Sequence, residues 1–488
     1  MNNDWTFELI EYYFKEIEEI SKELNLDYYP LQIEIINSEQ MLDRYSNIGM
    51  PIFYNHWSYG KSFIQNKHLY DNGKMGLAYE IILNLNPSIC YLMENNSMTM
   101  QILVLAHCIG HSGFFCNNYM FKDWTDADSI LDYLNFAKKY VKKCEETYGV
   151  EAVEETLDAC HSIMTYGVDR YKRKPFNLSK EELKQQEREK YLEKQVNDLW
   201  RTVPNKKKKN EDKKPLFPKE PEENILYFIE KNSPSLKIWQ REIVRIVRKI
   251  SQYFYPQTLT NLCNEGFACF VHYYIMNRLY EKNIINEGHY LEFIHNHSNV
   301  VFQLPYDDKR YNGINPYALG FEIFMDIKRI SENPTEEDKE WFPDLINKPW
   351  LDNILNAMKN YRNDSFILQF LSPRLMRKWK MFVWSDKYSE PNYLIKKIQN
   401  EQGYKEIRST LSKQYSNMYQ IPDIQVYDVD LKGDRTLYLR HYEINGIPLN
   451  GTLAHETLKY IKKLWGYKVV LISWDSDKNT FTNKWEIL

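Results

Sequence analysis

Residues 97–115 read SMTMQILVLAHCIGHSGFF. Ser97 is a residue type that caps helix N-termini. The segment after it is apolar on nearly every side, and a helix with this pattern is buried inside a protein. The sequence therefore predicts a central buried helix that carries His107 and His111 in its interior.

His107 and His111 are four residues apart, so they share one face of that helix. Two imidazoles in this arrangement can bind one metal ion, which is the geometric basis of the HExxH zinc motif. In that motif a glutamate follows the first histidine and acts as general base, whereas Cys108 stands here. A neutral thiol, with a reference pKa of about 8.5, is a poor base. The pair indicates a metal site more than peptidase activity, and hydrogen-bonded core histidines are the alternative interpretation.

A third ligand has to come from another part of the chain. The segment at residues 264–268, Asn-Glu-Gly-Phe-Ala, places Glu265 among small residues that let another helix approach closely. In one class of zinc hydrolases the third ligand is a glutamate on a downstream helix. We therefore predict a zinc site formed by His107, His111 and Glu265.

Further histidines are candidates for a role in catalysis. His272 is seven residues after Glu265 and shares its helix face, and His161 lies on a helix expected at residues 151–166. We predict that His161 and His272 are catalytic, orienting the substrate or shuttling protons. His295 and His297 have the HxH spacing by which strands place two ligands together, and a turn into a strand is one interpretation of this segment.

The pattern of apolar residues predicts an α+β fold that is mainly helical. Helices are expected at 5–24, 38–48 and 236–254, with a new helix starting at Pro256. Strands are expected at 79–85 and 89–93, the second as the edge strand along which an extended substrate would lie. We predict a zincin-like body, in which a small mixed or antiparallel sheet accompanies the active-site helices.

The chain is predicted to fall into four parts. Residues 1–176 and 224–362 form the two halves of the body, carrying the histidine pair and Glu265 respectively. Residues 177–223, which contain Lys206 to Lys209 and several prolines, form a charged linker. Residues 363–488 form a small C-terminal α+β module, with strands at 425–429, 435–443 and 467–473, a helix at 452–465 and a tight turn at Asn445-Gly446.

Composition excludes several classes of function. The net charge is only −4 over 488 residues, which gives no overall attraction to nucleic acid or to an anionic membrane. The N-terminal residues lack the pattern of a signal peptide, and no apolar run suggests insertion into a membrane, so we expect a cytoplasmic protein. The seven cysteines include no CxxC pair, which disfavours disulfides and a cysteine-only zinc site. Phosphate-loop, dinucleotide-binding and nucleophile-elbow motifs are absent from the sequence.

Long strings spread along the chain resemble the stage V sporulation protein R (SpoVR) family. They are YNHWSYGKSF (54–63), GLAYEIILNLNPSICYLMENNSMTMQ (76–101), WTDADSILDYLNFAKKYV (124–141), QYFYPQTLTNLCNEGFACFVHY (252–273), INPYALGFEIFMDIKRI (314–330) and SFILQFLSPRLMRKWKMF (365–382). The resemblance implies a role in bacterial endospore formation, at the stage of cortex peptidoglycan assembly. It also implies a pathway shared with a serine protein kinase of the PrkA type and a von Willebrand-type partner.

Two hypotheses for the biochemical function follow. In the first, the protein is a metal-dependent hydrolase that acts on a peptide or cell-wall precursor without the usual HExxH glutamate. In the second, it is a non-enzymatic regulatory or scaffold protein that keeps a degenerate metallohydrolase body. Cys108 favours the second hypothesis, and the predicted buried polar cluster favours the first.

Overall fold

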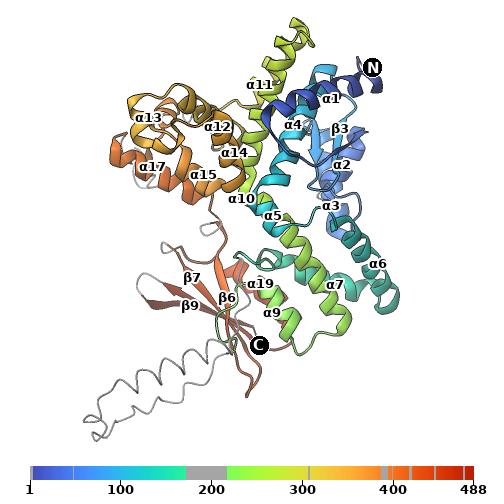
Figure 1. Cartoon of the computed structure of the whole chain (residues 1–488). Helices are drawn as coiled ribbons and strands as arrows, with labels where there is room; N and C mark the ends of the chain where they lie inside the picture. The colour runs from blue at the N-terminus through green and yellow to red at the C-terminus, as the bar shows by residue number, and fades with distance from the viewer. Residues whose placement is uncertain are drawn as a thin grey trace, which may run out of the picture. The chain divides into compact units, whose positions relative to one another are not determined.

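Figure 1 shows the computed structural model of the chain. It describes residues 4–47, 49–171, 217–305, 308–385, 394–397, 399–416, 420–444, 447–475 and 479–487. Most of the linker predicted at 177–223, and the turn predicted at Asn445-Gly446, lie outside these ranges.

The chain divides into two compact units, each built from segments that are distant in sequence. Residues 1–158 and 249–422 form the first unit, and residues 159–248 and 423–488 form the second. The first unit therefore takes its core from both sides of the predicted linker. It contains both the histidine helix and Glu265.

The first unit contains a three-stranded sheet of β1 (Leu31–Ile36), β2 (Glu80–Ile82) and β3 (Ser88–Met93), in the order β1-β3-β2. Strand β3 pairs parallel with β1 and antiparallel with β2, and all its residues are buried. The prediction that residues 89–93 form an edge strand is therefore wrong. The unexpected strand β1 occupies the position where an extended substrate would have lain.

Helix α4 (Met98–Asn117) is the buried helix predicted from residues 97–115. The Ser97 hydroxyl caps it by accepting a hydrogen bond from the Met100 amide at 3.1 Å. The helix packs against the sheet, against α1 (Phe7–Ser21) and against α11 (Glu287–Val300). It is long and apolar enough to cross a membrane, but 94% of its apolar window is buried inside the protein, as in a core helix.

Helix α10 (Ile238–Glu281) runs without interruption through Pro256. The prediction that a new helix starts at this proline is therefore wrong. Residues on both sides, such as Tyr253, Tyr255 and Leu259, are buried. Burial of these side chains offsets the cost of the missing proline N–H, because helices in proteins are stabilised mainly by tertiary packing.

Small residues bring α10 into close contact with two other helices. A Cβ atom added to Gly110 of α4 would lie 2.6 Å from the Ala268 Cα atom of α10. A Cβ atom added to Gly266 would lie 2.4 Å from the Gly320 carbonyl carbon of α12 (Pro316–Glu332). As the sequence around Glu265 predicted, the backbones touch because no larger side chain separates them.

Further helices and two short strands complete the first unit. They are α2 (Ser38–Ser46), α3 (Trp57–Asp71), α5 (Tyr119–Trp124), α6 (Ile130–Tyr148), most of α7 (Val150–Ser162), α13 (Glu336–Trp341), α14 (Trp350–Asn360), α15 (Asn363–Phe370), α16 (Pro373–Lys378), β4 (Val383–Ser385), β5 (Leu394–Lys397) and α17 (Glu401–Gln414).

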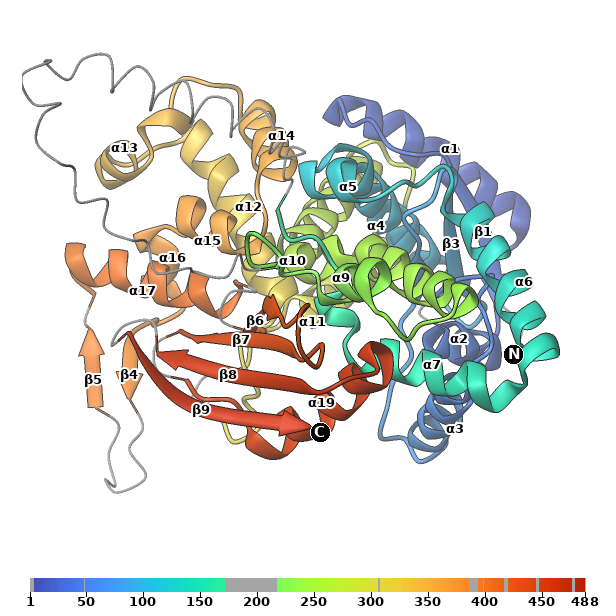
Figure 2. The ribbon, with the colours of Figure 1, turned by 90° about the horizontal axis from the view of Figure 1, so that it is seen from below.

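The second unit is built on a four-stranded sheet in the order β6-β7-β8-β9 (Figure 2). Its strands are β6 (Asp423–Val429), β7 (Leu437–Glu443), β8 (Val469–Asp475) and β9 (Thr480–Ile487). Helix α19 (Gly451–Trp465) connects the parallel strands β7 and β8 and packs on the sheet, and α9 (Ile225–Asn232) lies against β6. The sequence predicted these elements except α9 and β9. Together the two units confirm an α+β fold that is mainly helical.

Candidate metal centre

His107 and His111 face the same side of α4, as their spacing requires. Their Nε2 atoms lie 3.0 Å apart, and the two residues are only 4% and 5% exposed. The helix buries them because nearly all of its other side chains are apolar. Two imidazole nitrogens are thus directed at one point inside the first unit.

Glu265 approaches this point from α10. One of its oxygens, Oε2, lies 3.3 Å from His111 Nε2 and 3.6 Å from His107 Nε2. Among the described residues, this buried oxygen has no hydrogen-bond partner. A buried carboxylate is costly unless a positive charge accompanies it, and either a protonated His111 or a bound cation can supply that charge.

Glu80 is a second carboxylate at the cluster, and the sequence analysis did not single it out. It lies on β2, and its Oε1 atom is 3.8 Å from His107 Nε2. The strand predicted at 79–85 already indicated where Glu80 points. Because side chains alternate along a strand, Ile81 and Glu80 lie on opposite faces of the sheet. What the sequence did not reveal is that the face bearing Glu80 packs against α4.

The separations between these atoms match those of a metal site. In a tetrahedral zinc site, bonds of about 2.0–2.1 Å place the ligand atoms about 3.3 Å apart. The separations here are 3.0, 3.3, 3.6 and 3.8 Å. His107, His111 and Glu265 can therefore offer one ligand atom each to a single ion.

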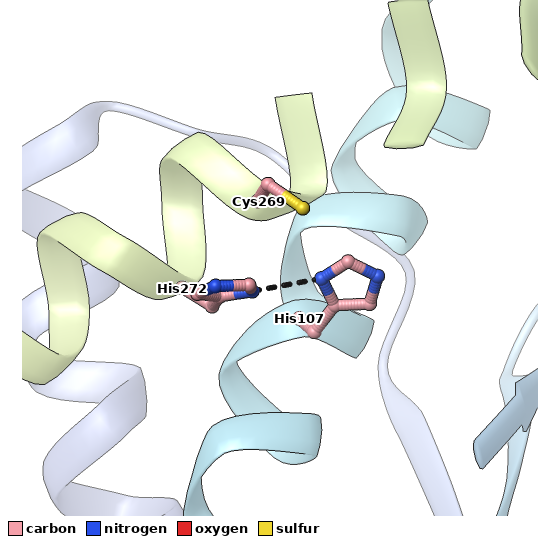
Figure 3. A group of neighbouring side chains, drawn as sticks. All are labelled: His107, Cys269 and His272. Carbon is pink, nitrogen blue, oxygen red and sulfur yellow. Dashed lines mark hydrogen bonds between the residues drawn. The ribbon is translucent and has the colours of Figure 1, made fainter. Parts of the chain in front are cut away.

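Other polar side chains form hydrogen bonds with the Nδ1 atoms of the two imidazoles. His111 Nδ1 lies 3.0 Å from the side-chain oxygen of Asn264, and His107 Nδ1 lies 2.9 Å from His272 Nδ1 (Figure 3). His272 Nε2 lies in turn 2.8 Å from His297 Nδ1. Partners of this kind fix the ring orientation and the tautomer of histidines that bind metals.

His295 and His297 lie on helix α11 and not in a turn leading into a strand. The HxH spacing therefore separates the two side chains. His297 is buried against His272, whereas His295 is exposed and contacts Asn299 at 3.2 Å.

Cys269 forms a second group with His107 and His272. One ligand atom from each of these three buried residues lies within 4.8 Å of the others. Figure 3 shows His107 and His272 joined by their hydrogen bond, with the thiol of Cys269 beside them. His107 thus belongs to both groups.

The charges of the cluster support one another. Burial by itself would raise the pKa of Glu265, but His111 and His107 outweigh it and hold this pKa well below its usual value. Burial by itself would lower the pKa of His111, but Glu265 and Asn264 outweigh it and raise this pKa. Burial raises the pKa of Glu80, and the negative charge of Glu265 adds to the effect. Glu265 is therefore the anionic member, and Glu80 accepts a proton more readily.

Cys108 cannot act as the missing base. Its thiol is hydrogen-bonded to Cys90, and this bond and its burial both raise its pKa well above the usual value. The side chain is a fully buried part of the core. The residue in the position of the HExxH glutamate is therefore a protonated thiol directed at β3.

The two predicted catalytic histidines lie in different units. His272 is in the first unit and 1% exposed, and it contacts His107. His161 is half-buried near the end of α7, in the segment that belongs to the second unit. A catalytic role for His161 stays a prediction from the sequence.

Comparison with known proteins places these residues in a family context. The family model described as SpoVR like protein matches residues 4–420, and the model of the SpoVR-like C-terminal domain matches residues 422–476. The uncharacterized protein YcgB of Escherichia coli strain K12 is 54% identical over 482 residues, which cover 97% of this chain and 93% of that protein. No solved structure matches the chain.

Proposed function

The chain belongs to the SpoVR-like family. From the arrangement of His107, His111 and Glu265 we propose that its first unit is a zincin-like, metal-dependent hydrolase. One observation carries this proposal. Glu265 Oε2 is a buried carboxylate oxygen within 3.6 Å of the Nε2 atoms of both His107 and His111. This arrangement suits a cation bound between the three side chains.

We propose zinc as the ion. Two imidazoles and one carboxylate form the ligand set of zinc hydrolases, which leave a fourth position open for water or substrate. When bound, the ion supplies Lewis-acid chemistry, because it polarises the substrate and makes water more acidic. The protein's own part is to hold His107, His111 and Glu265 in place through α4 and α10.

We propose that Glu80 takes the role of general base that Cys108 cannot fill. A base must lie within reach of the water that it deprotonates, and Glu80 lies beside the ligand His107. The raised pKa of Glu80 brings its carboxylate closer to the neutral range, where a base works best. In this scheme Glu265 binds the ion and Glu80 moves the proton.

The biological setting of this proposal comes from the family. We propose that the protein acts in the cytoplasm during spore cortex formation, on a peptide or cell-wall precursor. A serine protein kinase of the PrkA type and a von Willebrand-type protein are the partners that we propose for its pathway.

Metal analysis of the purified full-length protein tests the site. We expect about one equivalent of zinc. Glu265→Gln should remove it, because the neutral amide loses the charge that balances the ion. Glu80→Gln should keep the metal but abolish hydrolysis across a panel of peptides and cell-wall precursors. His295→Gln, which changes an exposed histidine in the same unit, is the matched control and should keep both properties.

The outcomes separate the roles of the two carboxylates. A folded wild-type protein that takes up no divalent metal refutes the proposal. Loss of zinc in Glu80→Gln assigns Glu80 as a ligand and leaves the base to be found. Retention of zinc in Glu265→Gln shows that the third ligand is a different residue.

The second candidate function is a regulatory or scaffold protein that keeps a degenerate hydrolase body. The observation that favours it is the buried Cys90–Cys108 pair where a catalytic glutamate would stand. In this case a metal would hold α4 and α10 together without turnover. Full activity of the Glu80→Gln protein in its biological pathway would favour this function.

A further inference from the structure

The two ring nitrogens of His107 face different surroundings. Its Nε2 atom is directed at His111 and the two carboxylates, and its Nδ1 atom lies 2.9 Å from His272 Nδ1. His272 comes from α10, and its own Nε2 atom lies 2.8 Å from His297 of α11. Three imidazoles on three helices therefore form one line of hydrogen bonds, which we call the relay.

The single N–H of each neutral imidazole fixes the donor-to-acceptor direction of the hydrogen bonds in the relay. A neutral imidazole has one N–H donor and one acceptor nitrogen. If the Nε2 lone pair of His107 binds an ion, its proton must be on Nδ1, and this N–H donates to His272 Nδ1. His272 then holds its proton on Nε2 and donates it to His297 Nδ1. One set of tautomers therefore satisfies every contact in the relay.

We propose that His272 and His297 position His107 and set the metal affinity of the site, although neither of them binds the ion. This inference rests on the proposed function, since it assigns the residues that support the proposed ligand. An acceptor behind a histidine ligand fixes the ring and raises the basicity of its metal-binding nitrogen. His272 is thus a positioning residue, and the catalytic role predicted for it from the sequence is replaced.

The surroundings of His297 make the relay rigid. Its ring packs against those of Phe321, Tyr273 and Phe293, with centroid separations of 4.8, 5.0 and 5.8 Å. His272 and His297 are 1% and 6% exposed. Water has little access to these imidazoles, and hydrogen bonds between them are stronger in such a low-dielectric interior.

A second ion at Cys269 explains the same contacts less well. The Nδ1 atoms of His107 and His272 are 2.9 Å apart, and one N–H shared between them accounts for this contact without a second ion. His107 would also have to lose both ring protons to bind two ions. Cys269 is therefore a buried neighbour of the relay.

The test compares two substitutions at each relay position in the full-length protein. The side-chain oxygen of asparagine takes roughly the place of the histidine Nδ1 atom, so His272→Asn and His297→Asn each keep an acceptor. His272→Leu and His297→Leu remove it but fill similar space. Zinc affinity is measured by competition with a chromogenic chelator, and thermal unfolding identifies the variants that fold.

We expect His272→Leu to bind zinc about 10–100-fold more weakly than the wild type, which is the usual effect of losing such a partner. His272→Asn should recover most of the affinity. His297→Leu should weaken binding in the same direction, and His297→Asn should recover it. If His272 and His297 only filled space, their leucine and asparagine variants would lose similar zinc affinity, because both substitutions disturb the packing of an imidazole. If His272→Leu fails to fold, the comparison of His297→Leu with His297→Asn tests the relay instead.

Two results would overturn the relay while leaving the proposed metal site intact. The first is wild-type affinity in the folded leucine variants. The second is a second equivalent of zinc that Cys269→Ala removes, with sulfur seen in the first shell by X-ray absorption spectroscopy. Failure of the wild type to bind zinc would instead refute the proposed function, and the relay with it.

Discussion

The partly buried Glu265 and the buried His111 illustrate how two groups stabilise each other's charges. Each would be driven toward its neutral form by burial alone, yet the pKa of Glu265 is lowered and that of His111 is raised. Without an ion, and below the raised pKa of His111, the pair is a carboxylate beside an imidazolium, 3.3 Å apart. An ion therefore has to displace a proton from His111, and the affinity for metal must depend on pH.

The sign of that dependence follows from the raised pKa of His111. Below this pKa a proton occupies the nitrogen that the ion needs, so the apparent zinc affinity should fall as pH decreases, by up to about tenfold per pH unit. The loss should begin above pH 6.5, the ordinary value for histidine, because the pKa is raised. Competition titrations between about pH 6 and about pH 8.5 measure the slope around this ordinary value. A zinc affinity independent of pH over this range would show that the ion does not displace a proton from His111.

The sequence was informative about some of these residues and silent about others. His107 and His111 were found from a spacing within one helix, and Glu265 from small residues in another, and the structure brings all three together. Glu80 was not found, and His297 was singled out only for an HxH spacing typical of strands. Each reaches the cluster through a tertiary contact, of β2 with α4 and of α11 with α10, and local periodicity does not encode such contacts.

At the scale of helices, the centre depends on how closely α4 and α10 approach. Gly110 lies between the two histidines in the sequence and touches Ala268, which lies three residues after Glu265. The helix contact and the ligand cluster are thus the same place in the fold. A change in the spacing of the helices should change the metal site with it.

Gly110→Ala tests this dependence. The new methyl group would lie 2.6 Å from the backbone of Ala268, which cannot move aside independently of its helix. Overpacking of this kind costs about 1–3 kcal/mol. We expect a lower melting temperature and a loss of bound zinc, because Glu265 moves away from the histidines. Thermal unfolding and metal analysis of the same sample measure both effects.

Gly60→Ala is the matched control, since Gly60 lies within helix α3 and a Cβ atom there would have no neighbour within 4 Å. Alanine is preferred over glycine inside a helix by about 1 kcal/mol, so this variant should be slightly more stable and keep its zinc. Unchanged stability of Gly110→Ala would contradict the close contact of the two helices.

Local sequence patterns predicted some helices and strands correctly and others wrongly. Helix α4 and its Ser97 cap were predicted because both signals are local. The break at Pro256 and the edge position of residues 89–93 were wrong, and both errors have tertiary causes. Packing on both sides of the proline keeps α10 continuous, and the unpredicted strand β1 covers the free edge of β3.

At the scale of the molecule, the first unit is built from segments on both sides of the predicted linker. Trypsin should cleave first at Lys206 to Lys209, where the sequence has a run of lysines and no apolar periodicity. The fragments should stay associated, because α4 and α10 share a core. Size-exclusion chromatography of the cleaved protein, compared with a denaturing gel, measures this. Fragments that separate under native conditions would contradict a shared core.

The last prediction connects the metal centre to the proposed role in sporulation. Deletion of the gene in a spore-forming host should leave the early stages intact and give spores with a defective cortex. Poor refractility and low heat resistance would report the defect. The basis is the family to which the chain belongs, whose models match residues 4–420 and 422–476. Normal heat resistance in the deletion strain would refute the role in that host.

Complementation of this strain then separates the two candidate functions. If the centre performs hydrolysis, Glu80→Gln should fail to restore heat resistance, although the protein is folded, abundant and loaded with zinc. If the ion only holds α4 and α10 together, Glu80→Gln should restore it, and only variants that lose the metal, such as His111→Ala, should fail. His111→Ala alone would not distinguish them, because loss of a structural ion can unfold a protein and resemble lost catalysis. The decisive comparison is therefore between a variant that keeps the ion and one that does not, each checked for abundance in the cell.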